Sequence, residues 1–174
     1  LELAWLIPLA LIGTVCGWLY FVSEHASEAF AHAIGERPVV KAMLAGLALA
    51  ICGTVLPYTM FAGETQAGVL METYLTIPAG VLIATGLVKA MLTPALINLG
   101  WRGGHFFPVI FSGVSLGYGL AILTGADPVF CVAVCTASTM GAVMRQPVMV
   151  VGLLLMCFPL KGIVCMIIAA VIAA

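Results

Sequence analysis

Long apolar runs are the feature that most constrains this chain. Three of them, residues 3–22, 39–56 and 77–99, approach the roughly 20 residues that a helix needs to cross about 30 Å of hydrocarbon. Hydrophobic residues make up 64% of the 174 residues and charged residues only 7%, so there is too little polar surface to cover a water-soluble globule. The sequence therefore predicts an all-α polytopic membrane protein.

Shorter apolar runs follow, and several of them are too short to span a membrane alone. They cover residues 106–123, 129–144, 148–160 and 163–174. Prolines, which are preorganised for the first helical turn, lie at or near the start of most runs: Pro8, Pro38, Pro78, Pro108, Pro128 and Pro147. Asp127 is a good N-cap for the helix that begins at Pro128. We expect tilted and partly spanning helices whose ends meet inside the protein.

The charged residues gather in breaks between the runs. Residues 23–32 are predicted to continue the first helix out of the membrane, Gly35 to end it, and Pro38 to start the next helix. We interpret His25 and His32 as solvated interface residues in preference to pH sensors.

Two further charged residues have more than one interpretation. Residues 57–76 are predicted to form the most polar loop, and Glu64 within it is a proton or ion site or, as we favour, a solvated carboxylate or helix N-terminal anion. Lys89 lies inside the run 77–99, where an unpaired charge costs several kcal/mol. It either attracts ions from a wet cavity or reaches the interface or backbone carbonyls along its flexible stem.

Composition argues against several functional classes. Six Lys and Arg residues, scattered along a chain of net charge −1, argue against nucleic-acid binding. Cys131 and Cys135 share a helical face but have no His, Asp or Glu at ligand spacing, so we interpret them as packing residues and expect no metal and no cofactor. No nucleophile–base pair or phosphate-binding loop occurs, and we therefore do not expect an enzyme.

One stretch, GWRGGHFFP at residues 100–108, interrupts the apolar pattern. Gly103 and Gly104 break the helix, and irregular backbone at membrane depth is tolerated only where it is buried in protein or lines a water-filled cavity. The helix that starts near Pro108 would point free backbone N–H groups into this break, and such a helix N-terminus attracts anions. From the residues alone, an anion site and a packing turn without a ligand are equally supported.

Residues 103–108, GGHFFP, resemble the GGxFxP anion-binding loop of the CLC chloride channels and proton-coupled anion exchangers. Residues 112–117, SGVSLG, resemble the small-residue helix after that loop, and residues 141–147, GAVMRQP, resemble the family's AGVTRAP turn between two short helices. Lys89 falls where many relatives carry a basic residue. The resemblance is to the second of the family's two inverted halves. We therefore expect residues 1–174 to be a single transmembrane domain, the C-terminal half of a CLC-like pore domain, truncated at both ends.

The resemblance implies transmembrane transport of small inorganic anions such as chloride, by a channel or a proton-coupled exchanger, in the inner (plasma) membrane of a bacterium. Backbone amides of the loop would hold the anion, and the implied anion-binding residues are Gly103, Gly104, His105, Phe106, Phe107 and Pro108. Lys89 and Arg102 are candidate charges along the pathway. The family also implies a homodimer, packed through residues 3–22 and the helices from Pro147 onward.

Some residues depart from the family's pattern. The gating glutamate and the GSGxP and GxEGP motifs belong to the first half and do not occur in this chain. Arg102 replaces a proline or small residue, and it either funnels anions or lies at the headgroups. His105 replaces an aliphatic residue, and we expect it to pack beside Phe106 in preference to tuning anion affinity with pH. Residues 61–64, FAGE, resemble a loop of the family's bacterial ion-transport branch.

A second interpretation stays open at this point. In it, the chain is a non-transporting membrane subunit or a decayed fragment that dimerises through small-residue helix faces such as Gly13-x-x-x-Gly17. An upstream region with an inverted set of apolar runs and a Glu-Gly-Pro motif would favour transport instead. In both interpretations Arg145 is a structural residue that satisfies helix C-terminal carbonyls.

Overall fold

The computed structural model describes residues 2–60, 63–158 and 162–174, and these residues form helices and no strand. The helices are α1 (Leu6–Ile34), α2 (Pro38–Val55), α3 (Glu64–Thr73), α4 (Ala79–Asn98), α5 (Phe106–Thr124), α6 (Pro128–Met144), α7 (Pro147–Leu154) and α8 (Ile163–Ala173). Three short 3-10 turns accompany them: η1 (Glu2–Trp5), η2 (Pro57–Thr59) and η3 (Tyr74–Thr76). The predicted all-α membrane architecture is confirmed.

Within the described residues, α1, α2, α4 and α5 are long and apolar enough to cross a membrane. The first three correspond to the predicted runs at residues 3–22, 39–56 and 77–99. The remaining apolar helices are shorter, with 17 residues in α6, 8 in α7 and 11 in α8. At about 1.5 Å per residue, these helices fall short of a 30 Å hydrocarbon core.

The helix boundaries follow the signals in the sequence at several points. α1 ends at Gly35, whose φ of 72° suits glycine and whose N–H donates to His32 O, and α2 then begins at Pro38. Asp127 caps α6, because its carboxylate accepts a hydrogen bond from the Phe130 N–H at 3.1 Å. These boundaries were predicted correctly.

The predicted loop at residues 57–76 was wrong, because most of it is helical. It contains η2, α3 and η3. Glu64 lies in the first turn of α3, where a carboxylate interacts favourably with the helix dipole. Leu70 is fully buried against Leu82 and Phe111. This tertiary contact stabilises a helix whose own sequence is only weakly apolar.

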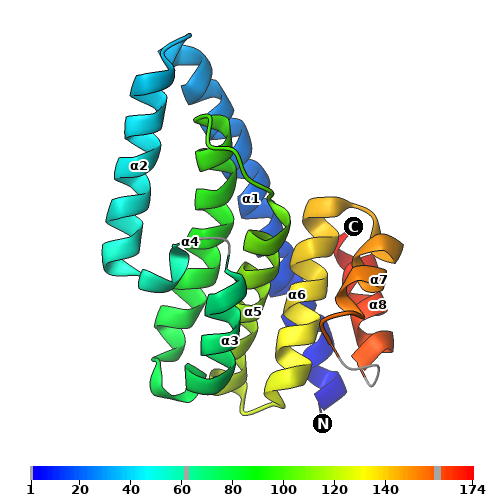
Figure 1. Cartoon of the computed structure of the whole chain (residues 1–174). Coiled ribbons are helices and arrows are strands. Elements are labelled where there is room, and N and C mark those ends of the chain that lie inside the picture. The colour runs from blue at the N-terminus through cyan, green and yellow to red at the C-terminus, as the bar shows by residue number, and fades with distance from the viewer. Residues whose placement is uncertain (1, 61–62, 159–161) are drawn as a thin grey trace.

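The core lies where α5 and α6 pack against each other and against α1, α4 and α8 (Figure 1). Glycines allow the backbones to approach closely. A Cβ on Gly117 would lie 2.5 Å from Val132 Cα, and a Cβ on Gly113 would lie 2.5 Å from Thr136 Cα. Close packing through small residues is the usual way in which helices associate in membranes.

The Gly13-x-x-x-Gly17 face is also part of this packing. Gly13 contacts Ser138 and Gly17 contacts Ala142, both on α6 of the same chain. Thr139 Oγ1 adds a hydrogen bond to Gly13 O at 3.2 Å. The expectation that this face serves dimerisation was therefore wrong, because α6 already covers it.

α2 is the outlier of the bundle. Figure 1 shows it at the outer edge, joined to the end of α1. One face carries exposed apolar side chains at four-residue spacing: Val39, Met43, Leu47, Ile51 and Val55. A small cluster of Ala31, Ala45 and Leu99 attaches this helix to α1 and to the end of α4.

Candidate functional site

The chain turns back on itself between α4 and α5. Gly100 has a φ of 96°, its N–H donates to Ile97 O at 2.9 Å, and the Trp101 N–H donates to Leu96 O at 3.1 Å. These two bonds are the pair that defines a Schellman helix end, which glycine favours. Residues 101–104 then return along α4, so α5 begins beside the interior of α4 and not level with its end (Figure 1).

The first turn of α5 carries backbone donors that no described side chain caps. His105 is the N-cap residue, and Phe106 and Phe107 are the first two helical residues. Pro108 has no N–H, and the next amide, that of Val109, donates to His105 O at 3.1 Å. The amides of Phe106 and Phe107 are therefore the donors at the positive end of the helix dipole.

A cavity of about 380 Å³ opens between this turn and α4. It brings together five of the eight residues predicted to bind the anion or to place a charge along its pathway: Lys89, Arg102, Gly103, Gly104 and Pro108. Thr93, Leu96, Ile97, Trp101 and Leu49 complete its described walls. We call it the basic cavity, because two cationic side chains line it.

Lys89 is almost completely buried, with 4% of its surface exposed, and its ammonium donates a hydrogen bond to Thr59 O at 2.6 Å. Lys89 thus reaches a backbone carbonyl, as one of its two interpretations predicted, and a role in attracting ions stays a prediction. It also lines the basic cavity. Bonding to the carbonyl offsets part of the cost of burying an ammonium.

Arg102 differs from Lys89 because its side chain is exposed and forms no ion pair with the described residues. It lies at the wall of the basic cavity next to Gly103 and Gly104. Neither glycine has a positive φ, and a Cβ at either position would meet no atom within 4 Å. The two glycines therefore leave open space at the cavity and are not required by the backbone conformation.

The aromatic residues of the loop do not face the basic cavity. The His105 and Phe106 rings pack beside each other, with centroids 6.4 Å apart, as expected, and Phe106 also packs against the core. Phe107 lines a second cavity, of about 300 Å³, on the other side of α5. The first turn of α5 thus separates two cavities.

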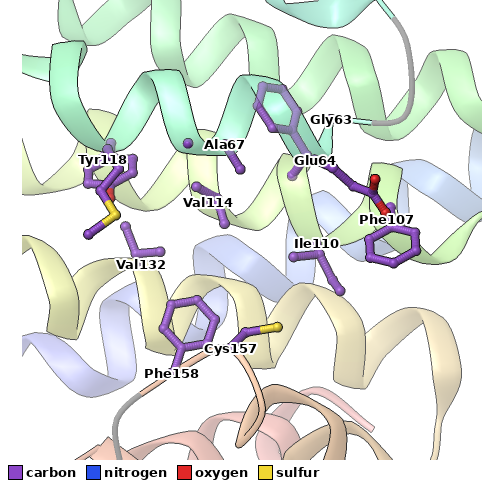
Figure 2. Close-up of a pocket in the computed structure, with 13 residues that line it drawn as sticks. Gly63, Glu64, Ala67, Phe107, Ile110, Val114, Tyr118, Val132, Cys157 and Phe158 are labelled. Atoms are coloured by element: carbon purple, nitrogen blue, oxygen red, sulfur yellow. The ribbon is translucent and has the colours of Figure 1, made fainter.

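The second cavity lies between α3, α5, α6 and the segment after α7 (Figure 2). Among the described residues that line it, all are apolar apart from Glu64, Tyr118 and Cys157; they include Ile110, Phe111, Val114, Val132 and Phe158. Glu64 lies at its rim. We call it the Glu64 cavity. Phe61 and Ala62, which precede Gly63 and Glu64 in the FAGE segment, lie outside the described residues.

Other residues singled out from the sequence have structural roles. Arg145 ends α6 with a φ of 51°, and its guanidinium lies 5.1 Å from the centroid of the Phe21 ring, a cation–π contact that the sequence did not predict. Cys131 and Cys135 are buried in the core of α6. Across the described ranges, no three His, Cys, Asp or Glu residues are placed to hold a metal ion.

The sequence did not predict the partner of Lys89 or the Glu64 cavity. The partner is the backbone carbonyl of Thr59, which any residue at that position would supply, so no residue pattern could reveal it. The Glu64 cavity depends on how α3 packs on α5, in a segment predicted to be a loop.

The comparison with known families agrees with this architecture. A family model described as voltage gated chloride channel matches residues 1–174, the whole chain. No curated protein and no solved structure matches the chain significantly. Members of this family are channels or transporters of chloride and other anions, and the apolar helices place this chain in a membrane. The chain belongs to the voltage-gated chloride channel family.

Proposed function

We propose that this protein carries small inorganic anions such as chloride across the inner (plasma) membrane, as a channel or a proton-coupled exchanger. The observation that carries this proposal is the basic cavity, which joins Lys89, Arg102 and the two loop glycines at the start of α5. An anion there is attracted by two cations and by the positive end of α5. Within the part of the chain that the structure describes, no comparable combination supports the alternative of a non-transporting subunit, whose glycine face is already covered by α6.

The parts of the site have different tasks. Arg102 is exposed and draws anions toward the cavity over a distance set by ionic strength. Lys89 is fixed by Thr59 and supplies a buried positive charge. Amides of the first turn of α5, at His105, Phe106 and Phe107, replace part of the ion's hydration shell. Because amide dipoles bind more weakly than a full ion pair, the anion can leave again, as conduction requires.

We also propose that two copies form a homodimer through outer apolar faces. Val148 on α7 is 87% exposed, and Val164 and Val171 on α8 are exposed as well. Ile7 and Leu11 expose a comparable face at the start of α1. Faces of this kind suit either lipid or a second copy, and crosslinking of single cysteines introduced at Val148 and Val164 would distinguish the two.

Anion efflux from liposomes that contain the complete natural protein tests the transport proposal. Gly104→Leu places a large side chain in the basic cavity, and we expect at least a tenfold loss of chloride efflux, about 1.4 kcal/mol. Gly80→Leu is the matched control, since a Cβ there also meets no atom within 4 Å but the residue lies at the start of α4, outside the cavity. Gly80→Leu should behave as wild type.

Two results would contradict the proposal. In the first, wild-type liposomes release chloride, fluoride and nitrate no faster than empty liposomes. In the second, Gly104→Leu transports as well as Gly80→Leu, which would show that the ion does not pass the basic cavity.

A further inference from the structure

We propose that the Glu64 cavity binds an amphiphilic organic cation, with the cationic group beside Glu64 and an alkyl chain along α5. This inference goes beyond the proposed function, because it concerns the cavity on the other side of α5 and a ligand of the opposite charge. A cavity of about 300 Å³ with a mostly apolar wall and few polar groups is typical of ligand sites.

A close contact between two helices holds the carboxylate at one end of the cavity. Gly63 has a φ of 104°, and a Cβ on it would lie 2.6 Å from Phe111 Cβ on α5. A side chain at this position would therefore push α3 away from α5. Glu64, the next residue, is exposed at the rim, and Figure 2 shows its carboxylate directed toward Phe107. A carboxylate and an aromatic ring are thus available to the same bound group.

Four aromatic side chains contribute to the described wall. Phe107, Phe111 and Tyr118 come from α5, and Phe158 follows α7. The faces of aromatic rings attract organic cations, and a set of such rings is the usual means by which proteins bind quaternary ammonium groups. The Tyr74 ring stacks on Tyr118 with centroids 4.6 Å apart and so fixes its position. Aromatic rings together with one carboxylate favour an organic cation over an anion.

The cavity is elongated along α5. Phe107 and Tyr118 are about three helical turns apart, or about 16 Å, and Figure 2 shows Ile110 and Val114 between them. Among the described residues, this middle part of the wall has only apolar side chains. An alkyl chain attached to the cation would cover them and remove apolar surface from water. The shape therefore favours a cation with a single apolar chain.

The charges of the lining favour a simple cation over a phospholipid. Glu64 is the only charged side chain among the described lining residues, and none of them is Lys, Arg or His. The phosphate of a lipid such as phosphatidylcholine would approach the carboxylate with no cation to pair with it. An alkyltrimethylammonium ion carries one positive charge and no phosphate, so it matches this lining.

Cys157 provides a direct readout of binding, because its thiol is free, exposed and part of the lining. The test measures its reaction with N-ethylmaleimide by mass spectrometry, in the complete natural protein in the uncharged detergent dodecyl maltoside. We expect saturating octyltrimethylammonium to slow the reaction at least about tenfold. Cys52 on α2 lies outside the cavity and should react as before. Each methylene removed from the chain should raise the half-protective concentration by up to about fourfold.

Two variants locate the probe in the cavity. Glu64→Gln keeps the size of the side chain but removes its charge, and we expect the half-protective concentration to rise about threefold, since the carboxylate is exposed. Gly68 lines the cavity, and a Cβ there meets no atom within 4 Å, so Gly68→Leu fills open space and should raise that concentration at least about tenfold. Gly80→Leu, at the start of α4, is the matched control and should leave it unchanged.

Several results would overturn the inference. If octanesulfonate protects Cys157 as well as octyltrimethylammonium does, the cavity does not select a cation. If Cys52 is protected equally, or if Gly68→Leu is protected like wild type, the probe acts elsewhere. Unchanged protection in Glu64→Gln, or no protection of wild type, also contradicts the proposal. None of these results affects the proposed anion transport, which depends on the basic cavity, and an absence of chloride efflux would leave this inference intact.

Discussion

α5 and α2 have the same mean hydropathy, 1.8, yet they occupy opposite environments. Of the apolar stretch of α5, 67% is buried inside the protein, whereas only 11% of that of α2 is buried. Hydropathy therefore identifies a helix that can enter a membrane but does not show whether protein or lipid will cover it. The difference lies in where the small residues are placed.

On α5, glycines face other backbones. Gly113 and Gly117 meet α6, and Gly119 meets the start of α4, where a Cβ would lie 3.0 Å from Ala79 O. On α2, Gly46 meets no atom within 4 Å. The same residue type thus allows close helix packing in one place and leaves an open surface in the other.

The largest loss of stability should come from adding a side chain where the backbones of α5 and α6 are in close contact. Gly117→Val places a Cβ 2.5 Å from Val132 Cα, and because backbone atoms cannot move aside, the two helices must separate. We expect the free energy of unfolding to fall by about 3 kcal/mol or more, measured by denaturation in mixed detergent. Gly46→Val on α2 is the control and should change it by less than about 0.5 kcal/mol. Equal losses in the two variants would contradict the contrast between the helices.

A buried leucine on α5 and an exposed leucine on α2 allow a second comparison of the two helices, with a smaller expected loss of stability. Leu116 on α5 is fully buried, and Leu47 on α2 is 58% exposed. Leu116→Ala leaves a cavity in the core, and we expect a loss of about 2 kcal/mol or more, while Leu47→Ala should cost less than about 0.5 kcal/mol. Thermal unfolding in one detergent checks both variants. A large loss for Leu47→Ala would show that α2 is covered by protein, as in contact with a second copy.

The smallest loss of stability is expected when a buried lysine on α4 is replaced, in comparison with a partly exposed lysine on α2. Lys89→Met removes the hydrogen bond to Thr59 O, which is buried between η2 and α4, and we expect a loss of about 1–2 kcal/mol. Lys41→Met, in the first turn of α2, is the control, since Lys41 is partly exposed there. If both variants unfold at the same denaturant concentration, the bond from Lys89 does not stabilise the fold, and its charge would then serve the cavity alone.

The two cavities beside α5 show that a sequence motif does not by itself reveal which of its residues line a site. The GGHFFP stretch and the two charged residues before it were recognisable in the chain. The structure places Lys89, Arg102, Gly103, Gly104 and Pro108 around one cavity. Phe107, in the same stretch, faces the other cavity instead. Adjacent residues of a helix point in different directions, so membership of a motif does not establish membership of a cavity.

The sequence by itself determined the membrane class, the apolar helices, most helix ends and the family. These features depend on local composition, on proline and glycine positions and on a motif, all of which act over a few residues. Only the tertiary structure decided that residues 64–73 form a helix, that Gly13 and Gly17 pack on α6, and that Lys89 bonds to Thr59 O. Each of these joins segments far apart in the chain, and the energy of such a contact depends on the partner's position in space, which local sequence does not specify.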